Sequence, residues 1–406
     1  MASRKAQAVI GAGYGDEGKG LLTDRLASVT ADAVIVRSNG GAQAGHTVVT
    51  PDGRRHVFHH FGSGALAGAP THLSAFFVAH PMFFIGERQA LKSLGAELAV
   101  SADPRAIVTT PFDMMINQAL ELSRGTGRHG SCGLGFGEAI ERCLRPDHAI
   151  RTGDLFQPDL AGRLWRIWTN WVPQRLGVLG LDRLPDDIMR HIDIETVIGR
   201  FLLDCEAYLD HVILRPDSRL GEKGQVIFEG AQGLLLDQDY GAFPHVTRSN
   251  TGLRNMLSIA WEAGIDGIDA HYVTRCYVTR HGAGPLAHEA GCLAGVDIVD
   301  PTNAPNAWQG TLRLAPLDLA VLRAAIAQDL QSSGSTAIVV APDLTVTCLD
   351  QAGSGFALLD EGGQMTVDPQ DAGRRIAGGA ALPLLGESWG ADRTYFRPVG
   401  DLARTG

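Results

Sequence analysis

A glycine-rich loop near the N-terminus constrains the fold more than any other stretch of the chain. Residues 11–20 read GAGYGDEGKG; they follow the short apolar run 7–10 and precede a segment, 21–27, with helical apolar spacing. A strand that runs through a glycine loop into a helix holds phosphate on backbone N–H groups and on the helix N-terminus. The sequence therefore predicts a strand–loop–helix unit that binds phosphate.

Two residues of this loop depart from an ordinary phosphate loop. Gly13-x4-Gly18-Lys19 fits the motif, but Gly20 follows where Ser or Thr would ligate Mg²⁺. Asp16 places a carboxylate where a polyanion should lie. The repulsion is costly unless a metal or an acid–base reaction uses that carboxylate, so the loop indicates catalysis rather than a phosphate cradle alone.

Bulk properties exclude several classes of function. The chain has 406 residues, enough for one large domain or two to three smaller ones, and its formal net charge of −10 gives no attraction to nucleic acid or anionic membranes. The longest apolar stretch, about 75–85, is too short to span a bilayer, and no long apolar signal core opens the sequence. The six scattered cysteines lack C-x2-C spacing, which indicates reduced thiols. We expect a cytoplasmic protein.

The remaining pattern is typical of an α/β protein whose strand-end loops bind ligands. We expect one large domain over 1–406, with a mainly helical subregion at 157–220 in which Trp165, Trp168 and Trp171 form a packing stripe. The expected strands are 33–36, a hairpin of 47–50 and 55–58, 225–228, 270–278 and 336–340.

Four further loops carry polar or glycine-rich chemistry. They are 39–47 (NGGAQAGHT), 124–137 (RGTGRHGSCGLGFG), 229–233 (EGAQG) with the downstream set 247–251 (TRSNT), and 279–285 (TRHGAGP). His46 can donate to a phosphoryl or leaving oxygen, or be purely structural. Gln232 offers a donor and an acceptor to the edge of a nucleobase, or bonds its own loop. The loop 124–137 either presents N–H groups to an anion or is a surface loop.

These segments, in this order, resemble the adenylosuccinate synthetase family. The strings are GDEGKG, GGAQAGHT, FEGAQGLLLDQDYGAFPHVTRSNT, TRHGAGP and, near the C-terminus, GADRT. The resemblance implies a fold related to P-loop NTPases, with a central mostly parallel sheet flanked by helices and with helical and small β subregions. It implies a Mg²⁺-dependent ligase of purine biosynthesis: GTP phosphorylates the 6-oxygen of IMP, and L-aspartate then displaces phosphate to give adenylosuccinate. It also implies a homodimer. The net charge, taken separately, predicts that the protein binds neither nucleic acid nor membrane.

The resemblance assigns roles to residues that match the family's motifs. Asp16 becomes the base that removes the purine N1 proton and also a Mg²⁺ ligand, with the Gly45 carbonyl near the metal. Lys19 binds the transferred phosphate, His46 is the acid at the 6-oxygen, and Gln232 holds the 6-oxygen region. The remaining nucleotide-binding positions are Gly15, Glu17, Gly18, Gly20, Gln43, Ser131, Cys132, Thr247, Arg151 and Asp350.

Several of these positions depart from the family pattern. Gln43 replaces Asn, Ser131 and Cys132 replace two threonines, and an arginine that the partner subunit lends to the nucleotide phosphate falls on His148, near Arg151. The arginine-rich loop for aspartate is reduced to Arg313, close to Thr311 and Trp308, and the lysine of the guanine-reading motif is Cys348.

The departures leave alternatives open. A divergent paralogue could act on dGMP or a purine-analogue nucleotide, with ATP instead of GTP or with another amino acid. Retained Asp16 favours IMP, because the phage-type branch that acts on dGMP can have Ser there. A non-catalytic nucleotide-binding protein is a second alternative. A third is a metal hydrolase on His56, His59 and His60, for which the sequence offers no nearby carboxylate.

Overall fold

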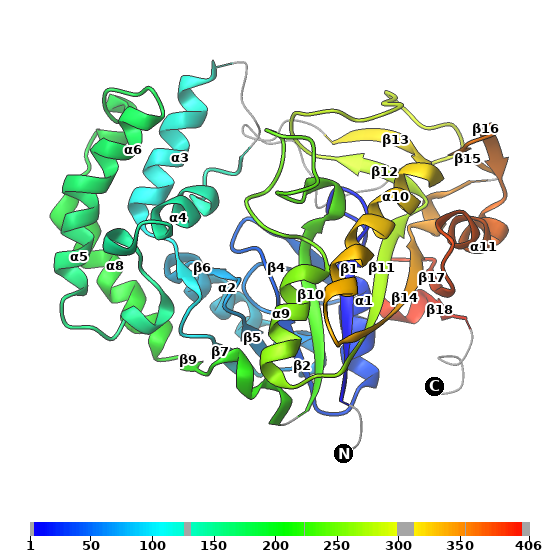
Figure 1. The fold of residues 1–406 in the computed structure, drawn as a ribbon, viewed down its shortest axis with the longest axis horizontal. Helices are drawn as coiled ribbons and strands as arrows, with labels where there is room; N and C mark the ends of the chain where they lie inside the picture. Colours follow the sequence, from blue (N-terminus) through cyan, green and yellow to red (C-terminus); the bar gives the residue numbers. More distant parts are fainter. Residues whose placement is uncertain (1–3, 126–130, 223, 299–311, 354, 400–406) are drawn as a thin grey trace.

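The computed structural model describes residues 4–125, 131–222, 224–298, 312–353 and 355–399. Within them a ten-stranded sheet runs through the molecule with helices on both faces (Figure 1). All its neighbouring strands are parallel except β17 and β18. In spatial order the strands are β18 (Phe396–Pro398), β17 (Leu384–Ser388), β14 (Val339–Thr347), β11 (Gly267–Arg275), β1 (Lys5–Gly11), β10 (Gln225–Gly233), β2 (Ala33–Arg37), β5 (Thr71–Leu73), β7 (Val100–Ala102) and β9 (Val212–Leu214). This confirms the predicted α/β fold class.

Three small sheets complete the β structure of the described residues. The first has four strands, the other two are pairs, and the predicted hairpin forms the β3–β4 pair. Their strands are β12 (Tyr277–Arg280), β13 (Arg313–Asp318), β15 (Phe356–Asp360) and β16 (Gly363–Val367); β3 (His46–Val49) and β4 (Arg55–Phe58); β6 (Val78–Ala79) and β8 (Ile107–Val108).

The helices cover the sheet and build a lobe at one side of it (Figure 1). In chain order they are α1 (Lys19–Val29), α2 (Pro81–Ser93), α3 (Pro111–Ser123), α4 (Phe136–Cys143), α5 (Leu160–Arg166), α6 (Val172–Val178), α7 (Asp186–Met189), α8 (Ile194–Leu209), α9 (Leu253–Ala263), α10 (Leu319–Leu330) and α11 (Pro369–Ala380). Local sequence sets several starts. Thr110 and Asp113 form a capping box before Pro111 at α3, and Asp193 caps α8 through the Thr196 N–H.

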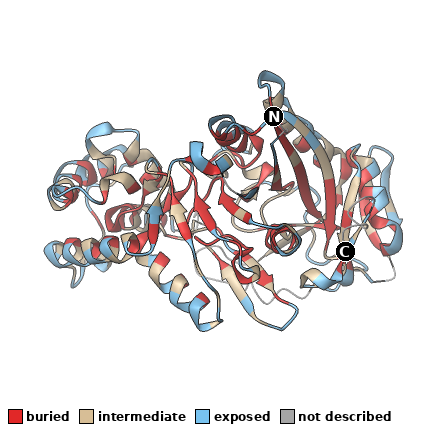
Figure 2. Cartoon of the chain, turned by 90° about the horizontal axis from the view of Figure 1, so that it is seen from below, coloured by how far each residue is buried: buried red, intermediate tan, exposed pale blue. Residues whose placement is uncertain are grey.

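The central strands are apolar on both faces because helices pack on each side. In β1, Val9 belongs to a core cluster with Leu22 of α1, whereas Ala8 and Ile10 belong to the cluster that contains Met256 of α9. Figure 2 shows these strands as largely buried. A third core cluster fills the helical lobe, around α2, α3, α5, α6 and α8.

Residues 157–220 are mainly helical, as predicted, from α5 to α8. The stretch ends with β9, which belongs to the ten-stranded sheet, and with the start of the short 3₁₀ helix η6 (Asp217–Glu222). The tryptophan stripe is only partly packed. Trp171 is buried and Trp168 contacts Phe112, whereas 40% of Trp165 is exposed. Residues Ile167–Trp171 form a π-helical turn between α5 and α6.

Two expected strands need correction. The run 270–278 breaks after Arg275, because β14 ends opposite it at Thr347 and the chain then pairs antiparallel with β13 as β12. The strand expected at 336–340 begins only at Val339, where its parallel partner β11 begins at Gly267. Pro342 lies inside this strand, which obscured its length in the sequence.

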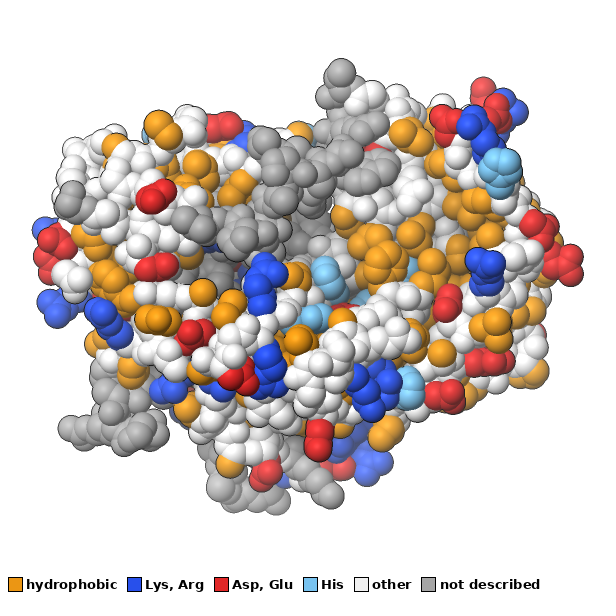
Figure 3. Space-filling model, turned by 180° about the vertical axis from the view of Figure 1, so that it is seen from behind, with side chains coloured by type: hydrophobic (Ala, Val, Ile, Leu, Met, Phe, Trp, Pro, Cys, Tyr) orange, Lys and Arg blue, Asp and Glu red, His pale blue; other side chains and the backbone are white. Residues whose placement is uncertain are grey.

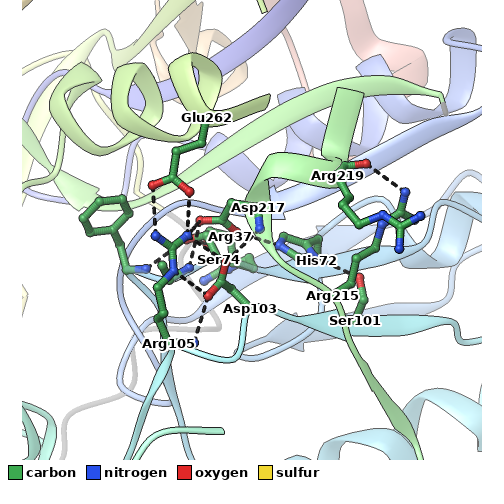
Figure 4. A network of polar contacts seen from close by, with 12 residues as sticks. Arg37, His72, Ser74, Ser101, Asp103, Arg105, Arg215, Asp217, Arg219 and Glu262 are labelled. Carbon is green, nitrogen blue, oxygen red and sulfur yellow. Dashed lines mark hydrogen bonds and ion pairs between the residues drawn. The ribbon is translucent and has the colours of Figure 1, made fainter. Parts of the chain in front are cut away.

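A polar network that is buried at His72, Asp103 and Asp217 connects β5, β7 and η6 (Figure 4). His72 on β5 bonds the Ser101 hydroxyl through Nδ1 and Asp217 through Nε2, both at 2.8 Å. Arg105 joins Asp103, at 2.8 Å, to Glu262 of α9, at 2.7 Å. Because these groups bond one another, the network pins the register of short strands that have little apolar area of their own.

In the described part of the chain, no helix is long and apolar enough to cross a membrane.

Candidate active site

A cavity of about 470 Å³ lies at the carboxyl ends of the central strands. On the face drawn in Figure 3, histidine side chains lie inside a hollow. Nine of the predicted site residues line the cavity: Gly15, Asp16, Gln43, Gly45, His46, Ser131, Cys132, Gln232 and Thr247.

The sheet topology explains why these loops meet. The loops that follow β1, β10 and β2 leave neighbouring strands at one edge, which is where open α/β sheets bind ligands. Asn39 joins two of them, since its amide accepts from the Ala231 N–H at 2.7 Å and donates to the Ala231 carbonyl at 2.9 Å. The edge is therefore held as one surface.

The opening loop binds an anion supplied by the protein itself. The Glu17 carboxylate accepts from the N–H groups of Gly13, at 2.9 Å, and Gly15, at 2.7 Å, and from Lys19 Nζ, at 2.8 Å. Lys19 Nζ also donates to the Gly15 carbonyl at 2.6 Å, and only 1% of this lysine is exposed. Gly18, at φ +93°, leads into α1 with no side-chain cap. The loop thus presents the donor set that a phosphate requires.

His46 is backed by a buried ion network. Its Nδ1 lies 2.6 Å from Glu229 Oε1, and the other Glu229 oxygen lies 3.1 Å from Arg37 Nη1. Ser63 donates to the same carboxylate through its N–H, at 3.0 Å, and through its hydroxyl. His46 Nε2 has no hydrogen-bond partner among the described residues. The network therefore orients the imidazole and leaves one ring nitrogen for a ligand.

Burial controls the charge of this network. It lowers the pKa of His46 to about 4, against the opposing effect of Glu229, so the imidazole is neutral at neutral pH. Burial alone raises the pKa of Glu229, but Arg37 and His46 outweigh it and lower that pKa to about 2. Glu229 is consequently a carboxylate under all ordinary conditions.

Asp16 lines the cavity and contacts the loop 279–285. Its Oδ2 lies 3.1 Å from His281 Nε2, and Arg275 Nε donates to its backbone carbonyl. Burial raises the pKa of Asp16, but the bond to His281 and the charge of Arg275 outweigh burial and lower it. Asp16 is thus ionised at neutral pH, as a proton acceptor must be.

Two glutamines bring amide groups to the cavity. Gln232 adopts a left-handed backbone at φ +64°, which is uncommon for a residue other than glycine and is typical of functional sites. Both amide atoms of Gln43 are buried without a hydrogen-bond partner among the described residues. Buried amides of this kind are ready to bond a ligand. Cys132 lies nearby, and burial raises the pKa of its thiol, which therefore stays protonated.

Other predicted residues lie away from the cavity. Lys19, Glu17, Gly18 and Gly20 form the loop behind Asp16 and the start of α1. Arg151 donates to the Arg105 carbonyl at 2.6 Å, and Asp350 is exposed in the turn η9 (Leu349–Gln351).

The predicted amino-acid site is only partly described. Arg313 is bound to the Glu289 carboxylate at 2.5 and 2.8 Å and to the carbonyls of Gly282 and Gly284. Thr311 and Trp308 lie outside the described residues.

The residues proposed for Mg²⁺ offer oxygen only, from the Asp16 carboxylate and the Gly45 carbonyl. This set suits Mg²⁺, which is commonly held by one or two carboxylates, water and substrate phosphates. The described residues contain no group of three or more His, Cys, Asp or Glu side chains that could hold a metal by itself.

The histidine-based alternative needs a correction. A carboxylate does lie beside these histidines: Glu87 of α2 is 3.2 Å from His60 Nδ1 and 3.7 Å from His56 Nε2. It also accepts the backbone N–H groups of His59 and His60, at 2.8 and 2.7 Å. These bonds engage the Glu87 carboxylate with the backbone of residues 59–60. Glu87 and the three histidines do not form a metal-binding group among the described residues.

Sequence reasoning missed Arg37, Glu229 and His281. Arg37 is the last residue of β2 and Glu229 lies inside β10, and the sheet register places the two residues opposite each other. Parallel pairing of the two strands was the information needed to find them. His281 lay in a loop that the sequence had marked but to which it gave no role.

A larger cavity, about 1140 Å³, lies at the other edge of the sheet, among the first residues of β2, β5, β7 and β9. None of the described residues that line it belongs to the predicted site. Volume alone therefore does not identify the reactive edge of this sheet.

Comparisons with known proteins agree with one another. The family model described as adenylosuccinate synthetase matches residues 8–338. The adenylosuccinate synthetase of Trichodesmium erythraeum is 36% identical over 294 residues, which cover 70% of this chain and 63% of the relative. That of Neisseria meningitidis is 33% identical over 297 residues, 71% of this chain and 66% of the relative. The chain thus spans just under two thirds of the length of these curated relatives.

Two solved structures share the fold over nearly the whole chain. The fully ligated adenylosuccinate synthetase of Plasmodium falciparum has a TM-score of 0.71 at 18% identity, covering 98% of this chain and 100% of that one. The succinoaminodeoxyadenylate synthetase of cyanophage S-2L, bound to dGMP and to dATP as an energy donor, has a TM-score of 0.59 at 15% identity, covering 99% and 97%.

Proposed function

This chain belongs to the adenylosuccinate synthetase family, and on that premise we propose that it is a ligase that attaches L-aspartate to C6 of a 6-oxopurine nucleotide at the expense of a nucleoside triphosphate. The observation that carries the proposal is the meeting of Asp16, His46 and Gln232 in one cavity. A base, an acid and an amide that reads a carbonyl edge are the groups that this reaction needs.

In the first step the ionised Asp16 removes the N1 proton of the purine. The 6-oxygen then attacks the γ-phosphorus, the new P–O bond forms, and the bond from that phosphorus to the β,γ-bridging oxygen breaks to release the diphosphate. Lys19 and the N–H groups of Gly13 and Gly15 hold phosphate once Glu17 yields them. The amide of Gln232 orients the 6-oxygen region.

In the second step the amino group of aspartate attacks C6, and phosphate leaves with the electron pair of the C6–O bond. The nitrogen loses a proton, and His46 Nε2 assists the departing oxygen. Free His46 is neutral, because burial lowers its pKa to about 4. When the 6-phosphoryl intermediate is present, its negative charge favours the imidazolium form of His46, and this imidazolium is the acid.

Asp16 and the Gly45 carbonyl would hold Mg²⁺ together with substrate phosphates, and the metal when bound offsets the negative charge of the transferring phosphoryl group. The chain's own cations near this point are Lys19 and Arg275.

Substrate identity rests on few residues. Asp16 supports IMP, whose N1 carries a proton that a carboxylate can take. The phage structure solved with dGMP motivates the alternative nucleotide, and Cys348 in place of a lysine motivates ATP as the alternative donor. Arg313 must exchange Glu289 for a substrate carboxylate, which makes the amino acid a separate question.

We also propose a homodimer. Arg151 lies outside the cavity of its own chain, as expected of a residue lent to a partner's nucleotide phosphate. Arg151→Ala should then raise KM for the nucleotide, and mixing it with an Asp16→Asn chain should restore part of the activity. Absence of any restored activity in mixed dimers would contradict the shared site.

The test of function is a phosphate-release assay with confirmation of the product by mass. The matrix combines IMP or dGMP, GTP or ATP, and L-aspartate or another L-amino acid. We expect turnover with IMP and L-aspartate. Absence of turnover with every 6-oxopurine nucleotide would overturn the ligase proposal, and turnover of dGMP but not IMP would transfer it to the alternative substrate.

Asp16→Asn is the sharpest variant for this proposal. It keeps the size and polarity of the side chain but removes its basicity, so kcat should fall by about 10³-fold while nucleotide binding is largely kept. Isothermal titration with the nucleotide provides the binding measurement. A kcat within about tenfold of wild type would exclude Asp16 as the base.

A further inference from the structure

We propose that His281 is a positioning residue that holds the Asp16 carboxylate in the orientation for removing the purine proton. The inference rests on the proposed function and adds a residue to which the sequence analysis assigned no role. His281 Nε2 lies 3.1 Å from Asp16 Oδ2, and both side chains line the cavity beside His46 and Gln232.

The contact is partly shielded yet reachable by a ligand. The exposed fraction is 23% for the His281 side chain and 22% for that of Asp16. A hydrogen bond in such a place is stronger than one in water, because fewer water molecules compete for its partners. One carboxylate oxygen is therefore fixed by the imidazole, and the other is the one left to face a substrate proton.

Asp16 needs an external partner because its own loop is otherwise engaged. The donors closest to it in sequence, the N–H groups of Gly13 and Gly15 and the ammonium of Lys19, bind Glu17. These bonds fix the backbone around Asp16 but do not set the rotation of its side chain. The His281 contact supplies that constraint.

His281 itself is carried by an anchored segment. The neighbouring Arg280 is buried, and its guanidinium donates to the carbonyls of Pro285, at 2.6 Å, Ala283, at 3.2 Å, and His245, at 3.2 Å. Gly284 has φ +109°, and a side chain there would overlap Arg280. The turn that follows β12 is thus closed around one arginine.

Residues 280–285 also contact the opening loop at two further points, both through Tyr14. The Arg280 guanidinium lies 4.4 Å from the centre of the Tyr14 ring, and the Tyr14 hydroxyl donates to the Pro285 carbonyl at 3.3 Å. Arg275, at the end of β11, donates to the backbone carbonyl of Asp16. The backbone and the side chain of Asp16 are therefore both held by contacts with residues 275–285. Such contacts preorganise a proton acceptor.

The role is one of geometry, and a neutral donor should fulfil it. His281→Gln keeps an N–H at about the distance of Nε2, whereas His281→Ala removes it. We expect His281→Ala to lower kcat by about 30-fold, within the range that misplacing a catalytic group produces, with KM for the nucleotide changed by less than about threefold. His281→Gln should recover kcat to within about fivefold of wild type.

A second measurement isolates the step. Positional isotope exchange in ¹⁸O-labelled triphosphate, with IMP present and the amino acid omitted, reports reversible phosphoryl transfer to the 6-oxygen. We expect exchange in the wild type and in His281→Gln, and about 30-fold slower exchange in His281→Ala. The control is His288→Asn. His288 follows the 275–285 segment by three residues, its Nε2 lies 3.7 Å from Asp318, and it does not line the cavity. This variant should leave kcat and exchange unchanged.

The outcomes separate the two proposals. No turnover by the wild type in the full substrate matrix overturns the proposed function. An active wild type with an equally active His281→Ala overturns the positioning role alone. Equal impairment of the Gln and Ala variants, at unchanged midpoints of thermal unfolding, also overturns it, because a neutral donor then fails to replace the imidazole.

Discussion

Two buried histidines of this protein face buried carboxylates at nearly the same distance, and only one lies at the cavity. His46 Nδ1 is 2.6 Å from Glu229, and His72 Nε2 is 2.8 Å from Asp217. The other nitrogen of His72 is bonded to Ser101, whereas His46 Nε2 has no partner among the described residues. Pairing with a carboxylate therefore does not by itself distinguish the predicted catalytic histidine. The distinguishing feature of His46 is an unpartnered ring nitrogen in a residue that lines the cavity.

The largest expected difference is in catalysis. His46→Gln should lower kcat by about 10³-fold, because an amide cannot exchange a proton with the leaving oxygen. The matched variant His72→Gln should keep kcat of the folded protein within about twofold, since it lies in a closed network. Steady-state rates normalised to folded protein provide the measurement. Equal losses in the two variants would erase the distinction.

The contributions of Glu229 and Asp217 to the free energy of unfolding should change in opposite directions on acidification. The pKa of Glu229 is lowered from 4.5 to about 2, so its stabilising effect is present above pH 4.5 and is lost as pH falls toward 2, by roughly 3 kcal/mol in total. Burial raises the pKa of Asp217 although His72 opposes it, so its contribution to stability is complete below pH 3.8 and is lost as pH rises from there through the raised pKa of the folded state.

Urea unfolding of wild type, Glu229→Gln and Asp217→Asn from pH 7 to pH 3 measures this contrast. The gap in unfolding free energy between wild type and Glu229→Gln should narrow on acidification, and the gap for Asp217→Asn should not. Parallel narrowing of both gaps would contradict the assignment.

At neutral pH, Asp217→Asn should destabilise the fold by about 2 kcal/mol without a comparable effect on kcat. The asparagine keeps the shape but loses one of the acceptors used by His72 and by the Ala75 N–H. Chemical unfolding together with initial rates checks the prediction. A tenfold fall in kcat with unchanged unfolding would instead tie the network to the active site.

The smallest effect is expected for Ser101→Ala, about 1 kcal/mol of unfolding free energy. Ser101 is only partly buried, so water can replace its hydroxyl at His72 Nδ1. Thermal unfolding and rates at 25 °C are sufficient to test it. Destabilisation above about 3 kcal/mol would mean that water does not reach this nitrogen.

Much of the fold could be predicted because local patterns dictate it. The opening loop predicts β1 and α1. The apolar run 33–36 predicts β2, and the turn at 51–53 predicts the β3–β4 pair. The break after Arg275 could not be predicted, since it depends on where β14 ends across the sheet. Pro342 likewise hid the length of β14, whose outer neighbour β17 pairs with it only from Leu344 onward.

The candidate site could be predicted only where local sequence patterns mark its residues. Asp16, His46 and Gln232 belong to sequence segments with recognisable glycine patterns, and the structure brings them to one cavity, with Gln232 inside β10 and His46 at the start of β3. Their neighbours Glu229, Arg37 and His281 are ordinary polar residues inside or next to strands, and only strand pairing and loop packing connect them to the predicted site residues. The roles of all these residues stay predictions until the variants are measured.

The Glu17 carboxylate in the opening loop has a consequence for affinity. The Glu17 carboxylate bonds Gly13, Gly15 and Lys19, so the buried Lys19 ammonium is paired and the loop is held in one shape by the protein itself. Under the proposed function, a triphosphate would bind by displacing Glu17, and its binding free energy would be the difference between its own contacts and those of Glu17. Its apparent Kd would exceed the intrinsic Kd by the inverse of the fraction of molecules in which Glu17 has withdrawn. Such a loop would favour ligands that carry more negative charge than one carboxylate.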